Sequence, residues 1–254
     1  MIDRRRLREL HGGDLPLHIL EQDYVQAVFL QELYRETDDL VFKGGTFLKH
    51  AHGLDRFSED LDFTRLAGIA VIDHVETAAG GLDRYGIPAT IDRVDRGPST
   101  ITWRLRYQGP LYDGTDRSRG SIDIDVSTRE DVIRDPEWRR LFVPYPETRA
   151  VTARCLTIEE AFAEKLRALS TRSQGRDLYD CWFLLQQGVS IEPELLERKM
   201  TVLDEPAEVT ISITAAEWER DLSVLLEHPP EYAEVRRTVT DAISDAEIPV
   251  HTSV

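Results

Sequence analysis

The chain has 254 residues, 47 acidic and 31 basic, so its formal net charge is −16 at pH 7. This length allows one large domain or two small ones, and the composition, 41% hydrophobic and 31% charged, is typical of a globular protein rather than a disordered one. The acidic balance disfavours loose electrostatic binding of nucleic acid by the chain as a whole, which leaves only a local arginine patch for that role.

The sequence contains no apolar run of the roughly 18–20 residues that span a bilayer, and its first residues lack the apolar region of a secretory signal. The two cysteines, Cys155 and Cys181, have neither the number nor the spacing of a disulfide framework or a metal knuckle. We therefore expect a cytoplasmic protein that does not contact a membrane. Only four of the 31 basic residues are lysines, which is typical either of a salt-rich cytoplasm or of a GC-rich genome.

The first 130 residues predict alternating helices and strands. Apolar residues spaced by three or four predict an amphipathic helix over residues 17–36. A short apolar run at 40–42 predicts a strand, followed by a tight turn at Gly44-Gly45 and a helix over about 46–52. A strand at 61–63 and a helix over 71–85 come next. Three further strands are predicted at 88–94, 100–107 and 119–127.

The pattern becomes helical after about residue 150. Thr157 followed three residues later by Glu160 has the form of a capping box and opens a helix to about residue 170. Further helices are predicted over 174–187, 192–202, 214–227 and 231–246. We predict an α/β (α+β) protein with an α/β domain over 1–150 and a helical C-terminal domain over 151–254, with the proline-rich stretch 143–146 at the boundary.

Two neighbouring features carry potential chemistry. Gly44-Gly45-Thr46 lies between a strand and a helix, where backbone N–H groups are free to face an anion, although such a pair alone is more often only a turn. Asp60 and Asp62 alternate on one strand, so their carboxylates share a face about 6–7 Å apart and suit Mg²⁺. The alternative for an isolated Asp-x-Asp is a solvated acidic strand.

The combination of these features is more specific than either one. A strand, a Gly-Gly-Thr turn, a short helix and an Asp-x-Asp strand within about 20 residues resemble the layout of polymerase-β-type nucleotidyltransferases. Members of that superfamily take a third carboxylate from a later strand. Asp123 and Asp125 are the candidates, since they lie on one face of the strand at 119–127. We favour Asp125, and a contribution from Asp123 or a site with only two acids stays open.

Two blocks resemble the AbiEii/AbiGii toxin family, which includes the MenT-type toxins. The first is K-G-G-T-F-L-K…G-L-D-R-F-S-E-D-L-D-F, within residues 42–63, and the second is E-E-A-F-A-E-K-L-R-A-L-S-T-R-S-Q-G-R-D-L-Y-D, residues 159–180. The resemblance implies a nucleotidyltransferase core with a mixed sheet, followed by a helical region that completes the active site. It also implies an NTP substrate and Mg²⁺ as the cofactor.

The resemblance assigns roles residue by residue. Asp60 and Asp62 are expected to bind Mg²⁺. Lys165 is expected to contact the triphosphate. Asp180, with Asp177, is expected to occupy the family's second catalytic acid position. The expected nucleotide-binding set is Lys43, Gly44, Gly45, Thr46, Arg56 and Ser58. Ser58 is expected to orient the turn or to contact a phosphate, and Arg56 to pair with Asp60 or with a phosphate.

The spacing of the residues in the second block also allows an interpretation that does not depend on the family. Lys165, Leu169 and Arg172 recur at helical spacing, and Asp177 and Asp180 are neighbours on the next helix. The alternative to a catalytic lysine is an ion-paired helical hairpin without a ligand.

Other residues have plainer interpretations. We expect Trp103, Trp138, Trp182 and Trp218 to be core or helix-contact residues. Arg104 and Arg106 alternate on one strand, which indicates either an arginine face for RNA or, as we favour, a half-exposed edge strand.

The sequence therefore predicts a Mg²⁺-dependent nucleotidyltransferase toxin of a toxin–antitoxin or phage-defence system. It is expected to transfer NMP from an NTP to an acceptor hydroxyl at a tRNA 3′ end, and to have a cognate antitoxin protein. The alternatives are a kinase-like phosphotransferase, a catalytically inactive nucleotide-binding module, and a small-molecule nucleotidyltransferase of the antibiotic-modifying kind.

Overall fold

The computed structural model describes residues 1–11, 14–66, 72–97, 100–128, 131–172, 174–201 and 206–252. The chain folds as two compact units. The first comprises Met1–Asp131 and Pro136–Cys155, and the second comprises Val132–Asp135 and Leu156–Val254. The proline-rich stretch 143–146, expected at a domain boundary, instead joins two strands of the first unit.

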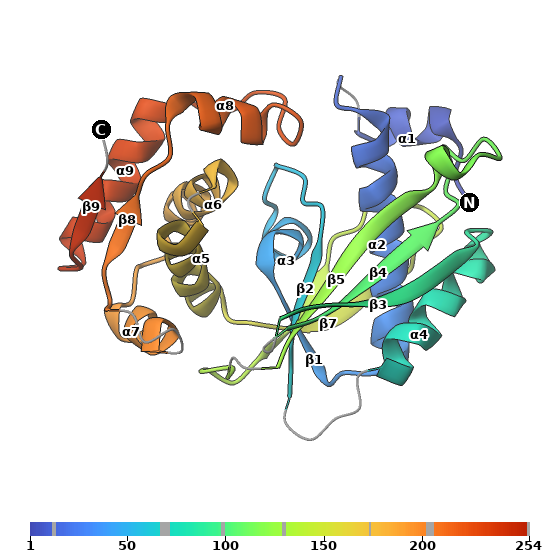
Figure 1. Cartoon of the computed structure of the whole chain (residues 1–254), viewed down its shortest axis with the longest axis horizontal. Helices are drawn as coiled ribbons and strands as arrows, with labels where there is room; N and C mark the ends of the chain where they lie inside the picture. The colour runs from blue at the N-terminus through green and yellow to red at the C-terminus, as the bar shows by residue number, and fades with distance from the viewer. Residues whose placement is uncertain are drawn as a thin grey trace. The chain divides into compact units, whose positions relative to one another are not determined.

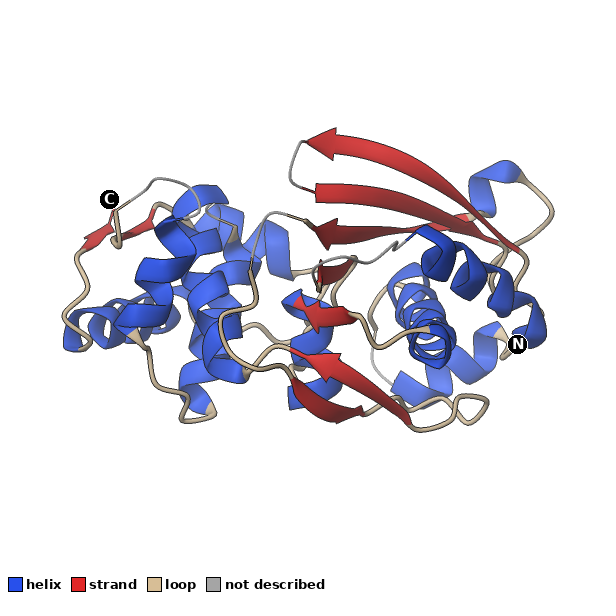
Figure 2. Ribbon diagram, turned by 90° about the horizontal axis from the view of Figure 1, so that it is seen from below, coloured by secondary structure: helices blue, strands red, loops and turns tan. Residues whose placement is uncertain are grey.

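A seven-stranded mixed sheet forms the centre of the first unit (Figure 2). Its order is β3-β4-β5-β2-β1-β7-β6. The strands are β1 (Leu40–Lys43), β2 (Leu61–Arg65), β3 (Ala89–Gly97), β4 (Thr100–Tyr107), β5 (Gly120–Ser127), β6 (Glu137–Leu141) and β7 (Val151–Cys155). β2 pairs with β5 and β1 with β7 in parallel, and the other neighbours are antiparallel. The sequence analysis did not predict β6 and β7.

The helices of this unit are α1 (Arg4–His11), α2 (Leu17–Glu36), α3 (Gly44–His52) and α4 (Ile72–Gly81), with the short 3₁₀ helices η1 (Leu82–Tyr85) and η2 (Asp116–Ser118). α2 and α4 pack against one another and against the sheet (Figure 1). α3 begins directly where β1 ends, so the Gly-Gly pair is the first turn of the helix. The residue after the helix, Gly53, closes it in the left-handed conformation with φ 76°.

α2 is not the amphipathic helix that its spacing predicts. Its apolar residues are buried, and so are polar residues on its other faces, including Glu21, Asp23, Gln26 and Glu32. Buried polar groups need partners. Glu32 accepts a hydrogen bond of 2.6 Å from Arg84, and Asp23 accepts one from Tyr145. α2 is therefore a central helix tied to its neighbours by hydrogen bonds as well as by apolar packing.

The second unit is mostly helical, as predicted. Its helices are α5 (Ile158–Arg172), α6 (Gly175–Gln186), α7 (Pro193–Thr201), α8 (Ala215–Leu222) and α9 (Tyr232–Asp245), and β8 (Val209–Ile211) pairs in parallel with β9 (Val250–Thr252). Among the described residues, no helix is both long and apolar enough to cross a bilayer.

The capping box predicted at Thr157 is only half formed. The Thr157 hydroxyl accepts a hydrogen bond of 3.3 Å from the Glu160 backbone N–H, but the Glu160 carboxylate accepts hydrogen bonds from the backbone N–H groups of Ile133 and Arg134. Glu160 therefore fastens residues 132–135 to the second unit, which explains why this short segment does not belong to the first.

Candidate active site

The Gly-Gly pair at the start of α3 packs directly against an acidic side chain. Gly44 has φ 77°, and a Cβ atom at this position would lie 2.8 Å from the Asp62 Cγ and overlap its carboxylate. A Cβ atom at Gly45 would lie 2.7 Å from the Ser58 Oγ and 2.8 Å from an Arg56 guanidinium nitrogen. The left-handed backbone and the close Asp62 favour glycine at position 44, and the first turn of α3 lies beside three of the residues predicted for the site.

Thr46 connects α3 to the start of β2. Its side chain is fully buried, and its hydroxyl donates a hydrogen bond of 2.6 Å to the Asp60 carbonyl oxygen. Thr46 thus positions the acidic segment from within, and a role as a phosphate contact, as predicted from the sequence, is not what this geometry favours. Arg56 is also buried and donates to the Phe57 carbonyl oxygen at 2.8 Å.

The loop that carries Ser58 and Asp60 is held by two glutamines of α2 that the sequence analysis did not single out. The Gln26 side-chain amide donates to the carbonyl oxygens of Ser58 and Glu59, at 3.0 and 2.9 Å. The Gln22 amide donates to the Glu59 carbonyl oxygen at 2.7 Å. Glutamines four residues apart in a largely apolar helix were the available signal, because such side chains rarely enter a core without a partner.

The acidic side chains come together through strand register. Asp62 on β2 lies opposite Lys43 on β1 and opposite Asp125 on β5. Residues paired in this way present their side chains on the same face of a sheet. Asp60 directly precedes β2 and is half-buried, as are Asp62 and Asp125. One face of the sheet thus presents a lysine and two carboxylates in adjacent strands.

The register also distinguishes the two candidates for the third acid. Asp123 accepts two hydrogen bonds from the Arg104 guanidinium, at 2.7 and 2.9 Å, and these bonds raise the pKa of Arg104. Asp125 instead accepts a hydrogen bond of 2.5 Å from the Thr102 hydroxyl. A carboxylate bonded to a neutral hydroxyl keeps its charge for a ligand, whereas a bidentate arginine pair neutralises it. This difference favours Asp125.

The available carboxylates suit Mg²⁺ better than a metal ion whose ligands are all protein side chains. In the described part of the chain, no group of three or more His, Cys, Asp or Glu side chains is placed to hold a metal ion. Mg²⁺ usually takes one or two protein carboxylates and completes its shell with water and substrate phosphates. Two half-buried carboxylates, Asp60 and Asp62, beside a glycine-lined helix start meet that requirement.

In the second unit, the residues of the second block form a buried ion cluster. The Lys165 Nζ lies 2.6 Å from an Asp180 carboxylate oxygen and 3.3 Å from one of Asp177. Arg172 makes two hydrogen bonds of 2.8 Å to Asp177. The two aspartates are fully buried, and Lys165 is 6% exposed. The ion-paired hairpin considered from the spacing is therefore present, and it joins α5 to α6.

Burial of this cluster affects the adjacent cysteine. Cys181 is fully buried next to Asp180, and burial, together with the charges of Asp177 and Asp180, raises its pKa well above the ordinary value of 9.0. Thiolate chemistry requires the opposite shift. Cys181 therefore belongs to the core and not to the chemistry.

The predicted arginine face on β4 is occupied by acidic partners. Arg104 pairs with Asp123, and Arg106 pairs with Asp92. β4 lies between β3 and β5, so the preferred interpretation as an edge strand is wrong. The register of three adjacent strands, which the sequence pattern does not specify, decided this outcome.

A mixed sheet with a Gly-Gly-Thr helix start against an Asp-x-Asp strand is the arrangement of a nucleotidyltransferase fold, as predicted. Solved structures bear out the fold. The chain matches MenT4, a nucleotidyltransferase toxin from Mycobacterium tuberculosis H37Rv, with a TM-score of 0.71 and 22% identity over 97% of this chain and 90% of that one. It matches JHP933 from Helicobacter pylori with a TM-score of 0.58 and 20% identity over 92% and 95% of the two chains. No curated protein sequence matches the chain.

The family is established by sequence. The model described as "Nucleotidyl transferase AbiEii toxin, Type IV TA system" matches residues 28–250. The chain belongs to this family and is thus a nucleotidyltransferase toxin, an enzyme, of a type IV toxin–antitoxin system. Membership implies an NTP substrate and a cognate antitoxin. The predicted family, fold class and enzyme class are confirmed.

Proposed function

We propose that this toxin transfers a nucleoside monophosphate from an NTP to a hydroxyl group at a tRNA 3′ end, in the cytoplasm and with Mg²⁺. The observation that carries the proposal is the packing of Gly44 against the Asp62 carboxylate, because it joins an anion-binding type of helix start to an acid suited to Mg²⁺. The acceptor oxygen bonds to the α-phosphorus, the bond from this phosphorus to the oxygen that bridges it to the β-phosphate breaks, and pyrophosphate leaves with that electron pair.

The acidic side chains have separate roles in this proposal. Asp60 and Asp62 hold Mg²⁺, which when bound supplies positive charge against the charge that develops on the phosphate oxygens. Asp125 takes the proton from the acceptor hydroxyl as a general base. The hydrogen bond from Thr102 orients the Asp125 carboxylate for this role. Asp123, paired with Arg104, has no direct part.

The phosphates are bound mainly by backbone groups. The N–H groups of Gly44 and Gly45 at the start of α3 face the triphosphate, with Lys43 adding a positive charge from the end of β1. Ser58 and Arg56 pack against Gly45 and keep the turn in shape. Thr46, through its bond to the Asp60 carbonyl oxygen, is a positioning residue.

In the second unit, we assign to Lys165 the positive charge that meets the triphosphate. Asp177 and Asp180 hold its ammonium group in one orientation, and Arg172 balances the charge of Asp177. An ammonium group fixed in advance loses little conformational entropy when it meets a phosphate. The support for this role is the match of the second block to the family together with the observed ion pairs.

The experiment that tests this reaction follows both ends of the triphosphate. The purified protein is incubated with tRNA, Mg²⁺ and NTPs labelled at the α- or the γ-phosphate. Nucleotidyl transfer places the α-label on RNA and the γ-label in pyrophosphate, whereas a kinase places the γ-label on the acceptor and releases nucleoside diphosphate. The absence of both products supports a binding module without catalysis. Asp92→Asn, which changes an exposed aspartate on β3 of the same sheet, is the matched control for Asp62→Asn.

A further inference from the structure

The edge strand β6 and the residue that follows it expose two aromatic side chains. Trp138 is 55% exposed and Phe142 is 76% exposed, which makes them the two large aromatic residues among the exposed hydrophobic side chains of the described residues. Trp138 was predicted to be a core or helix-contact residue, and its exposure contradicts a place in the core. Trp138 and the exposed Arg140 alternate on the strand and so share one face, and Phe142 directly follows the end of the strand, four residues after Trp138.

The neighbouring strand extends this face. Trp138 lies opposite Arg154 of β7 in the register, and Arg140 lies opposite Thr152. We use the name β6 strip for Trp138, Arg140, Phe142 and Arg154. β6 is the last strand of the sheet, so one side of the strip is open.

The arginines here differ from those on β4. In the part of the chain that the structure describes, Arg140, Arg149 and Arg154 form no ion pair, whereas Arg104 and Arg106 each pair with an aspartate. On β6 itself, the acidic residue Glu137 pairs with Arg139 and not with an arginine of the strip. In a chain of net charge −16, the strip is a local site of uncompensated positive charge.

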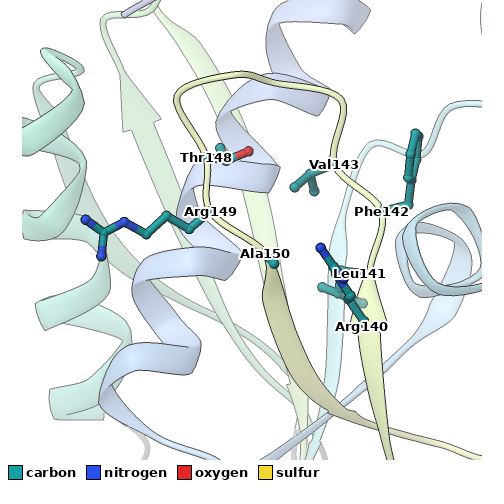
Figure 3. Close-up of a pocket in the computed structure, with 7 residues that line it drawn as sticks. All are labelled: Arg140, Leu141, Phe142, Val143, Thr148, Arg149 and Ala150. Atoms are coloured by element: carbon teal, nitrogen blue, oxygen red, sulfur yellow. The ribbon is translucent and has the colours of Figure 1, made fainter.

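A cavity adjoins the strip. It has a volume of about 430 Å³ and lies between the two arms of the β6–β7 connection, lined by residues 140–143 and 148–150. Figure 3 shows the Phe142 ring projecting from one arm and the Arg149 side chain extending from the other. The two side chains point away from one another (Figure 3), and Phe142 is the one that belongs to the strip.

The strip is fastened to the helix that begins at the candidate active site. The Phe142 backbone N–H donates to the His50 carbonyl oxygen at 2.7 Å, and the His50 Nδ1 lies 3.1 Å from the Phe142 carbonyl oxygen. His50 lies six positions after Gly44 in α3, which is about 9 Å along a helix axis. A strand of RNA on the strip is thus within a few nucleotides of the Gly-Gly turn, in the same unit.

From these contacts we infer that the β6 strip is a docking surface for single-stranded RNA, the unpaired end of the acceptor, with bases stacked on Trp138 and Phe142 and phosphates bound by Arg140 and Arg154. This inference rests on the proposed transfer to an RNA acceptor. Aromatic faces between arginines are the recognised means of holding unpaired bases, whereas the bases of a duplex are stacked on one another and unavailable.

The test measures RNA binding without NTP, so it does not depend on catalysis. Fluorescence anisotropy follows a labelled single-stranded oligoribonucleotide of about 12 nucleotides bound to the full-length protein. Trp138→Ala and Phe142→Ala should each weaken binding by about 5- to 150-fold, and Trp138→Phe should retain most of it. Arg140→Gln should also reduce the slope of log K against log salt by about 0.7. Val224→Ala and Arg220→Gln, exposed residues elsewhere, are the matched controls.

Several outcomes overturn the inference. These are unchanged RNA affinity in both alanine variants, equal binding of a duplex of the same sequence, or undiminished transfer to RNA in the double alanine variant. Loss of antitoxin binding with RNA affinity intact would assign the strip to a protein partner and would also overturn it. If the strip variants lose RNA binding while the unmodified protein transfers no label, the docking surface stands and the proposed reaction fails.

Discussion

Two glycines at opposite ends of α3 offer a matched pair of substitutions. Gly44 and Gly53 have nearly the same left-handed backbone, with φ 77° and 76°. Around Gly53 a Cβ atom would find no heavy atom within 4 Å, whereas at Gly44 it would lie 2.8 Å from the Asp62 Cγ. Alanine at either position therefore introduces the same backbone strain, but only Gly44→Ala also displaces a carboxylate assigned to the site.

The expected effects follow from these distances. Each substitution should lower the free energy of unfolding by about 1–2 kcal/mol, the cost of a left-handed non-glycine residue. In Gly44→Ala, the Asp62 Cγ must retreat from 2.8 Å to an ordinary contact of 3.4 Å or more, a shift of at least 0.6 Å. A misplacement of this order lowers the rate by about 10- to 100-fold, since about 1 Å corresponds to about 100-fold.

The assay combines urea unfolding with the rate of NMP transfer at saturating NTP and RNA. Gly44→Ala and Gly53→Ala should have similar stability, while Gly44→Ala alone should slow transfer by about 10- to 100-fold. Equal transfer rates in the two variants would refute the argument, because the contact between Gly44 and Asp62 would then have no part in the reaction.

The remaining predictions concern charge. Asp62→Asn should abolish transfer in a product assay and leave the melting temperature nearly unchanged, since it removes a half-buried charge and little volume; full activity would remove Asp62 from the metal site. Lys165→Met should lower the free energy of unfolding by about 3–5 kcal/mol in urea titrations, because it leaves the buried carboxylates of Asp177 and Asp180 without their lysine; a neutral result would contradict the ion-pair account. Burial lowers the pKa of His50 below its ordinary value of 6.5, so the unfolded chain binds a proton that the folded chain does not, and stability should fall as the pH drops through about 6.5. His50→Gln should make this decline shallower in unfolding titrations between about pH 7 and 5, and an unchanged slope would contradict it.

The parts of the fold predicted correctly from sequence are those with strong local signals. The helix over 17–36 has the predicted bounds, because apolar residues recur mostly every three or four positions along it. The sequence did not reveal that Glu21, Asp23 and Gln26 on this helix are buried as well, since burial depends on what packs around the helix. The strand at 61–63 and the Gly-Gly turn were recognisable because alternation and glycine are local properties.

Strands β6 and β7 were missed for a physical reason. Glu137–Leu141 has only two apolar residues and forms the edge strand, where one apolar face is enough. Val151–Cys155 alternates between buried and more exposed residues, but it is only five residues long and follows the proline-rich connection. The consequence was to place the change of domain too early in the chain and to overlook the exposed Trp138.

The sequence pattern could not predict which distant residues pair with one another. That Asp123 meets Arg104 while Asp125 meets Thr102 follows from the register of β4 and β5, in which a shift of one residue would exchange the faces. The same holds for Gly44 and Asp62, which lie 18 positions apart in the chain. Sequence spacing indicated the candidate residues, and the geometry added that the Thr46 hydroxyl is bonded to the Asp60 carbonyl oxygen.

The central claim is the transfer of a nucleotide to RNA, and the most direct measurement uses each α-³²P-labelled NTP in turn with Mg²⁺ and total tRNA, at low and at high salt. The account predicts that label from an NTP appears at the 3′ end of tRNA with the protein and with Asp92→Asn, and disappears with Asp62→Asn. Failure to label RNA with any NTP, or labelling that persists undiminished in Asp62→Asn, would contradict it.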